Sequence, residues 1–127
     1  MADTYYNDAN FYTVTCYNRL TQELSGKQYF DEATYHMYLN ENGLDGAATF
    51  NKDTDFKKLL RTVYDILEAL SNNLDLFRSV ETEFTTTGQA YEYLENRLQR
   101  LERRINSISD EVTDTGTKSV ITFLFKD

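Results

Sequence analysis

The sequence predicts a mainly α-helical protein, a small helical bundle with a long antiparallel helix pair and a C-terminal β-strand tail. Two series of apolar residues at steps of three and four carry this prediction, at residues 56–84, with Glu81 as a polar member, and at residues 91–112. This spacing places apolar side chains on one face of a helix. The two series are out of phase across residues 85–88, so we expect two packed helices with a break between them. Three further apolar residues widen the first face, which favours a bundle over a two-stranded coil: Leu59, Ile66 and Val80.

The length and composition are those of one soluble globular domain. A chain of 127 residues, 40% hydrophobic and 27% charged, suits one modest core. We divide it into a polar N-terminal arm at 1–9, a helical domain at 10–113, and a connector with a C-terminal strand at 114–127. No apolar run approaches the roughly 20 residues that span a bilayer, and the acidic start lacks the features of a secretory signal. We therefore expect a cytoplasmic location and no membrane partner.

The first helix of the domain admits two interpretations. Apolar positions within residues 10–24 fit a helix that stops at residues 25–26, a Ser-Gly pair. Residues 12–17 also have strand propensity. Cys16, the single cysteine, is predicted to be a small core hydrophobe, with a reactive thiol as the alternative.

A short second helix is predicted from its two ends. Asp31 is a suitable N-cap, and Asn42-Gly43 is a suitable C-terminal stop. The single histidine, His36, lies in this helix, where we expect a packing or surface role.

A loop at residues 43–55 connects this helix to the long one. Leu44 and Phe50 are its apolar residues, and we expect both to insert into the core. Asp53 or Thr54 is expected to cap the long helix that follows.

The flanks of the last helix are sorted by charge. Glu95 and Glu102 fall on one side, and Arg97 and Arg104 fall on the other. This is the layout of a helix that meets a partner helix. In a parallel pairing of two copies, Arg97 could reach Glu102 of a neighbouring chain, although exposed pairs contribute only about 0.2–1 kcal/mol each. Arg97, Glu102 and Arg104 are therefore candidate interface residues, and a solvated charged face is the alternative.

The C-terminal segment changes pattern completely. Residues 113–118 stop the helix, and residues 119–125 are β-branched and aromatic, the composition of a strand. An unpaired apolar strand is costly, so we expect it to join a neighbour's sheet. Pairing within the chain, with residues 12–17, and continuation of the helix are the alternatives. Its candidate interface residues are Val120, Ile121, Phe123, Leu124 and Phe125.

The sequence offers no recognisable catalytic or metal-binding arrangement. Residues 40–46 invite comparison with an EF-hand loop, but placing Gly46 at position 6 puts Lys52 at position 12, where an acid is needed. Phosphate-loop, Cys-x-x-Cys and Gly-x-Ser-x-Gly motifs are missing. We therefore expect no enzyme activity, no catalytic residue, no cofactor and no bound metal.

The net charge of −8 bears on the class of partner. Binding to phosphate backbones is dominated by Lys and Arg. The only basic cluster, in the last helix, is Arg97, Arg100, Arg103 and Arg104, and it is interleaved with Glu92, Glu95 and Glu102. Sequence-specific nucleic acid is therefore not an expected partner.

The order of elements resembles small virion proteins of tailed bacteriophages, above all the helical head-to-tail connector or neck adaptor. The residues that carry the resemblance are the turn Tyr-Leu-Asn-Glu-Asn-Gly-Leu-Asp at 38–45, the long helix Phe-Lys-Lys-Leu-Leu-Arg-Thr-Val-Tyr-Asp-Ile-Leu-Glu-Ala-Leu at 56–70, and the charged final helix. The resemblance covers residues 31–112 and includes no diagnostic motif, so it assigns no residue a role.

The resemblance implies a structural assembly protein, a ring-forming connector or neck subunit stacked beneath the portal. Its partners would be other virion proteins, portal or tail components, and copies of itself. Its location would be the virion, assembled in the host bacterial cytoplasm. The alternative is a soluble helical binding module or regulator that captures a partner through its helical hairpin. A secreted helical hairpin of the Trp-x-Gly type is disfavoured because tryptophan is absent.

Overall fold

The computed structural model describes residues 13–109 and folds them into helices, without a β-strand in that range. The mainly α-helical prediction is thereby confirmed. The predicted strand at residues 119–125 lies outside the described residues, as do the N-terminal arm and the connector. The helices are α1 (Cys16–Glu23), α2 (Glu32–Glu41), α3 (Lys52–Ser71), α4 (Leu74–Val80) and α5 (Thr87–Asn106).

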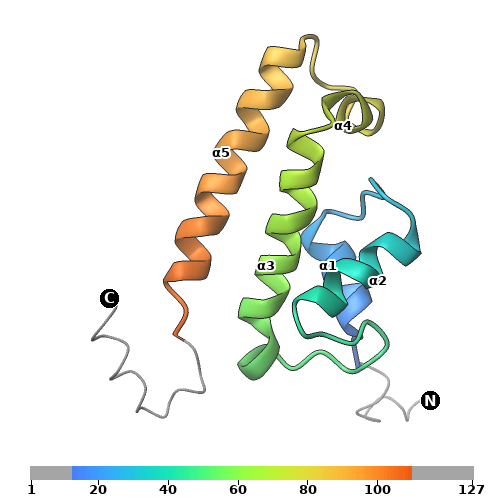
Figure 1. Cartoon of the computed structure of the whole chain (residues 1–127), viewed down its shortest axis with the longest axis vertical. Helices are drawn as coiled ribbons and strands as arrows, with labels where there is room; N and C mark the ends of the chain where they lie inside the picture. The colour runs from blue at the N-terminus through green and yellow to red at the C-terminus, as the bar shows by residue number, and fades with distance from the viewer. Residues whose placement is uncertain (1–12, 110–127) are drawn as a thin grey trace, which may run out of the picture.

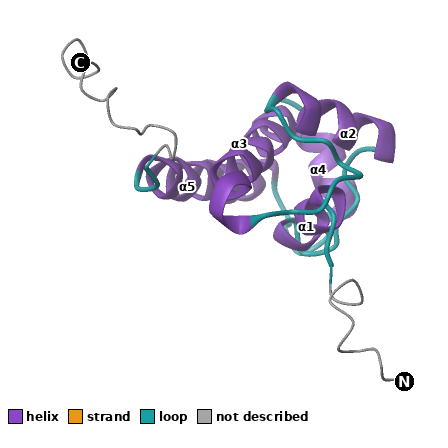
Figure 2. Cartoon of the chain, turned by 90° about the horizontal axis from the view of Figure 1, so that it is seen from below, coloured by secondary structure: helices purple, strands orange, loops and turns teal. Residues whose placement is uncertain are grey.

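The centre of the fold is the pair formed by α3 and α5, which stand side by side and run in opposite directions (Figure 1). α1 and α2 cover α3 on the side away from α5, and Figure 2 shows them there one above the other. The predicted antiparallel pair is therefore confirmed. One core cluster extends from Cys16 in α1 to Ile105 in α5, and the buried side chains of α3 lie at its centre.

The prediction of one long helix that reaches Phe84 is wrong, because α3 ends at Ser71 and α4 is a separate helix. Asn72 is the C-cap of α3, and Asn73 is the N-cap of α4, where its side-chain oxygen accepts a hydrogen bond from the amide of Leu76 at 3.1 Å. Asparagine favours such caps because its side chain competes with helical backbone hydrogen bonds. Two in succession end one helix and start another.

The predicted break before α5 is confirmed, since residues 81–86 are not helical. Thr86 is the N-cap, and its hydroxyl accepts a hydrogen bond from the amide of Gln89 at 3.0 Å. The Gln89 side chain reaches back to accept from the amide of Thr85, also at 3.0 Å. This reciprocal pair resembles a capping box. At its other end α5 stops at Asn106, so the expectation that the last helix continues to residue 113, the end of the predicted helical domain, is wrong. The hydroxyl of Ser107, the C-cap, donates to the carbonyl of Arg104 at 2.7 Å.

The start of α1 is also corrected. Residues 13–15 are extended, and the helix begins only at Cys16, with Thr15 as its N-cap. Thr15 forms an isolated antiparallel bridge with Thr49, and the amide of Phe50 donates to the carbonyl of Val14 at 2.7 Å. Within the described residues, the predicted strand propensity of residues 12–17 corresponds to a single β-bridge, that of Thr15. The predicted stop is confirmed, because residues 25–26 have positive φ.

The predicted boundaries of α2 are confirmed by its caps. The Asp31 carboxylate accepts a hydrogen bond from the amide of Thr34 at 3.0 Å, and Gly43 follows the helix with a φ of 81°. The loop that follows inserts Leu44 into the core and packs Phe50 against it, as predicted.

The cap of α3 differs from the prediction. Asn51, rather than Asp53 or Thr54, is the N-cap, and its side chain accepts from the amide of Asp53 at 3.0 Å. The carboxylate of Asp55 accepts in turn from the amide of Asn51 at 3.0 Å. Polar residues that can cap a helix follow one another here, so the composition alone does not select one of them.

Candidate functional site

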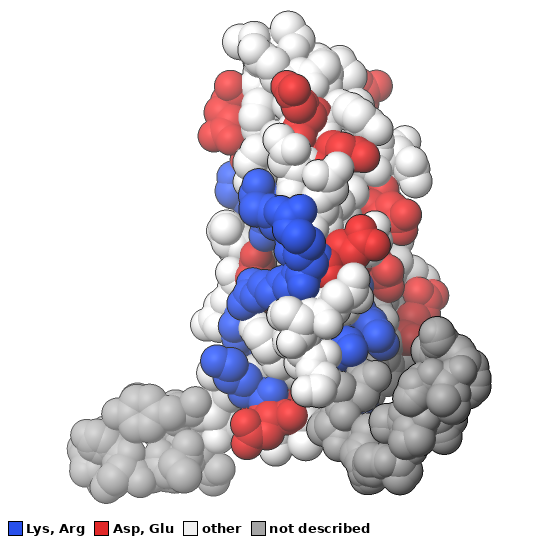
Figure 3. Space-filling model, turned by 90° about the vertical axis from the view of Figure 1, so that its left-hand side faces the viewer, with Lys and Arg blue, Asp and Glu red and all other residues white. Residues whose placement is uncertain are grey.

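A pocket of about 280 Å³ lies on the face that α5 presents beside α1. It is lined by Glu23 of α1 and by Arg97, Arg100, Leu101 and Arg104 of α5. We call this pocket the basic groove. Figure 3 shows Lys and Arg side chains gathered in a band over the left and centre of this side of the molecule. In a chain of net charge −8, the band is a local reversal of sign.

Two arginines of the groove are held by α1. The guanidinium of Arg97 donates to the backbone carbonyl of Glu23 at 2.9 Å, and that of Arg104 lies 3.9 Å from the Glu23 carboxylate. The helix that meets this flank is thus α1 of the same chain, an arrangement that sequence reasoning did not foresee. The contact of Arg97 with Glu102 of a neighbouring chain stays a prediction. Arg100 is exposed and has no hydrogen-bond or ion-pair partner within residues 13–109.

Next to the groove, Arg104 shares the ring of Phe56 with cations from elements that are distant in sequence. Three cations surround the ring of Phe56, with Arg19 at 5.9 Å, Lys52 at 5.4 Å and Arg104 at 5.0 Å from its centroid. A cation placed over an aromatic ring is stabilised by the electron-rich face. Arg19 also pairs with Glu23 at 2.9 Å, so a single carboxylate serves two of these cations. The groove therefore keeps an excess of positive charge.

The other flank of α5 faces α3 and carries acidic residues. A second pocket, of about 270 Å³, is lined there by residues that include Tyr64, Asp65 and Glu102 together with one cation, Arg61. Burial first, and then the nearby negative charges, raise the pKa of the Tyr64 hydroxyl. We call the acids responsible the acidic flank: Asp65, Glu68, Glu95 and Glu102. The structure thus separates the two charged sides of α5 in the way that the sequence predicts.

A partly buried polar contact joins the segment after α1 to the end of α4. The Glu81 carboxylate accepts a hydrogen bond from the Tyr29 hydroxyl at 2.7 Å and pairs with the Lys27 ammonium at 2.8 Å. Burial raises the pKa of Glu81, but the hydrogen bonds from Lys27 and Tyr29 outweigh it, so the net shift is downward. Glu81 is therefore a negatively charged member of the core margin that is satisfied by two donors.

We predict that Glu81→Gln loses about 1–3 kcal/mol of stability at neutral pH, because it weakens hydrogen bonds to a charged acceptor. A lowered folded-state pKa adds stability above the ordinary value of 4.5, and that stability is lost as pH falls through the folded-state pKa. Urea unfolding at pH 7 and pH 3 should thus show a larger acid loss in the wild type than in Glu81→Gln. Glu92→Gln, at an exposed position, should follow the wild type. Equal acid losses in all three proteins would refute the role of Glu81.

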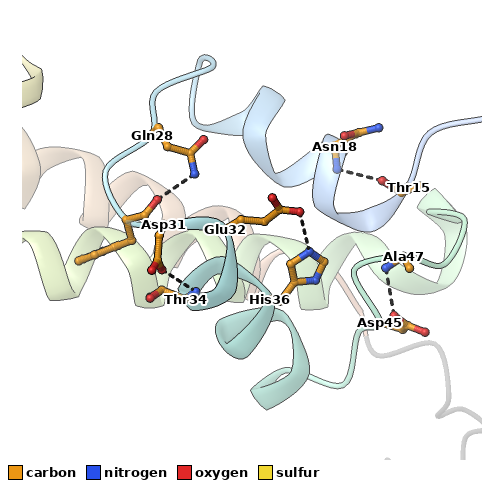
Figure 4. Close-up of polar contacts among 10 residues, drawn as sticks. Thr15, Asn18, Gln28, Asp31, Glu32, Thr34, His36, Asp45 and Ala47 are labelled. Atoms are coloured by element: carbon orange, nitrogen blue, oxygen red, sulfur yellow. Dashed lines mark hydrogen bonds and ion pairs between the residues drawn. The ribbon is translucent and has the colours of Figure 1, made fainter.

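Cys16 and His36 have packing roles. The Cys16 side chain is 1% exposed, and burial, aided by Asp55 and Asp45, raises the pKa of its thiol, which confirms the core prediction. His36 stacks on Tyr17 with centroids 4.9 Å apart, and Glu32 lies 3.6 Å from its Nε2 (Figure 4).

The loop that was compared with a calcium site serves a turn. The carboxylate of Asp45 accepts a hydrogen bond from the amide of Ala47 at 3.0 Å (Figure 4). Within residues 13–109, no group of three or more His, Cys, Asp or Glu side chains is arranged to hold a metal ion. None of the described helices is long and apolar enough to cross a membrane.

Comparison with protein-family models, curated proteins and solved structures found no match to this chain. The site therefore rests on its geometry alone. The sequence singled out Arg97, Glu102 and Arg104, and the structure assigns them to the two flanks of α5. The sequence did not single out Arg19 and Lys52, which join Arg104 at the ring of Phe56 from α1 and α3. The remaining candidates lie outside the described residues: Val120, Ile121, Phe123, Leu124 and Phe125.

Proposed function

We propose that the chain is a structural assembly protein that binds copies of itself and neighbouring proteins. The observation that carries the proposal is the continuous core cluster of the helical body, which extends from Cys16 to Ile105. In the sequence, the helical body is followed by the polar, glycine-containing residues 113–118 and then by an apolar segment at 119–125. A segment of this composition is stabilised by joining a strand or groove of a neighbour.

The finer form of the proposal is a ring-forming connector or neck subunit of a tailed-phage virion. Its support is the resemblance of residues 31–112 in element order and helix pattern. The partners are then portal or tail components together with further copies. A soluble helical binding module is the second candidate, and the specific observation in its favour is Arg100, an exposed cation of the groove without a partner within residues 13–109.

We predict that a chain ending at Thr117 folds but no longer assembles. Helical circular dichroism and cooperative melting should be close to those of the full chain, because the core cluster lies within residues 16–105. Sedimentation equilibrium should show loss of self-association. Phe123→Asp in the full chain should have the same effect, since a charge opposes apolar docking, whereas Lys126→Ala, at the residue that follows the segment, should associate normally.

Two results would contradict this prediction. If the truncated chain does not fold, the segment belongs to the chain's own core. If it folds and associates like the full chain, residues 118–127 are not an assembly element. A full chain that stays monomeric at every concentration, and does not bind purified portal or tail proteins, would instead favour the binding module.

A further inference from the structure

The two charged sides of the α3–α5 pair match each other in spacing. Arg97 and Arg104 are seven residues apart on one side of α5, and Glu95 and Glu102 are seven residues apart on the other. Seven residues of an α-helix span about 10.5 Å. Each side therefore presents charges at the same interval, with opposite sign, on one straight helix (Figure 1).

Both sides have charge that the chain itself does not neutralise. In the basic groove, Arg100 lacks a partner within residues 13–109, and the side chain of Arg104 is 50% exposed. On the acidic flank, Glu102 is exposed and lies beside Tyr64. Figure 3 shows both signs on one side of the molecule: the basic band runs over the left and centre, and acidic side chains lie along the right-hand margin, near the top and below the band.

Charge distinguishes the two kinds of partner that could occupy the basic groove, a second copy of this chain and a nucleic acid. A copy of this chain carries a net charge of −8, so two copies repel unless complementary patches meet. A nucleic acid carries one phosphate per nucleotide and its binding depends on many Lys and Arg contacts, whereas the groove is lined by three arginines, two of which already contact Glu23. The acidic flank, with its matching interval, is the better complement to the groove.

We propose that the basic groove of one copy receives the acidic flank of a second copy. The two surfaces are different, so the contact is head-to-tail, and its repetition closes a ring or extends a filament. This inference rests on the proposed function, and it adds a second contact between copies to the one proposed for residues 119–125, so that self-association requires both. Tyr64, which is partly exposed beside the acidic flank, adds apolar contact to that surface.

Charge reversal tests the pairing in the full chain. Arg100→Glu and Glu102→Lys should each raise the dissociation constant of self-association by about tenfold or more, because opposed like charges suppress docking. Mixing the two variants should restore association, because the altered groove meets the altered flank and each unaltered groove meets an unaltered flank. Wild-type association should weaken with added salt.

Arg103→Glu is the matched control. Arg103 is exposed on the same helix, outside the residues that line either pocket, and the change in net charge is identical. It should leave the dissociation constant within about twofold of the wild type, because exposed charges away from an interface act only weakly. Circular dichroism should show that all three variants are folded.

The outcomes separate the pairing from the wider function. If the wild type associates and Arg100→Glu associates equally well, or if Arg103→Glu weakens association as much, the groove does not bind a second copy although the chain still assembles. Failure of the mixture to recover association also overturns the pairing. If a 20-nucleotide single-stranded DNA binds the wild type and not Arg100→Glu, while copies do not associate, the groove is an anion site instead. A wild type that stays monomeric overturns self-assembly itself.

Discussion

Replacing Leu67 by alanine is expected to lower the free energy of unfolding by about 2–5 kcal/mol, the cost of removing a large apolar side chain from a packed core. Leu67 is 0% exposed and lies on α3, the helix that α1, α2, α4 and α5 all contact. A cavity there has rigid helices around it, so the surroundings cannot collapse into the space without moving several elements. Urea denaturation followed by circular dichroism measures the loss.

Glu92→Ala provides the comparison, because its side chain is exposed on α5 and substitutions at such sites usually change stability by less than about 0.5 kcal/mol. The m-value should be the same for the wild type and both variants, which would show that the change lies in stability and not in the extent of unfolding. Equal denaturation midpoints for Leu67→Ala and Glu92→Ala would mean that the core is centred elsewhere.

Periodicity predicted the helices correctly where the signal was local. Asp31 was recognised as a cap, and the break before α5 followed from the change of phase. The division between α3 and α4 was missed because Leu74 and Phe77 continue the heptad spacing and still pack in the core. Spacing records which side chains are apolar, and it does not record a change of helix direction. The Asn72-Asn73 pair was the signal that could have marked it.

Contacts between distant residues were beyond a local pattern. The extended residues before α1 are explained by Thr49 and Phe50, and these are identified only once the chain is folded. The charge sorting of α5 was visible in sequence because all of its members lie on one helix. That Glu23 of α1 meets the basic side was not visible, because pairing over 74 residues depends on how the helices pack.

One close approach in the structure involves a glycine to which the sequence gave no structural role. A Cβ atom at Gly46 would overlap the ring of His36 at Nδ1 and Cε1, and would lie 3.2 Å from a methyl group of Leu39. The His36 ring is not free to swing away without loss, because it stacks on Tyr17. The Gly46 carbonyl also accepts a hydrogen bond from the amide of Tyr17 at 3.0 Å, which ties this loop to the first turn of α1.

Gly46→Ala is therefore expected to destabilise the protein by about 1–3 kcal/mol, the usual cost of forcing an extra carbon into a packed site. Gly88→Ala is the matched control: its Cβ meets only a Thr86 oxygen at 3.9 Å in the first turn of α5, so alanine should be neutral or should stabilise by up to about 1 kcal/mol. In a His36→Ala background the overlap with the ring disappears, and Gly46→Ala should cost less by a coupling energy of about 0.5–3 kcal/mol. Urea denaturation of the four proteins of this cycle measures the coupling energy. Additive losses would show that the imidazole and the glycine do not constrain each other, and that the glycine is required only for its backbone.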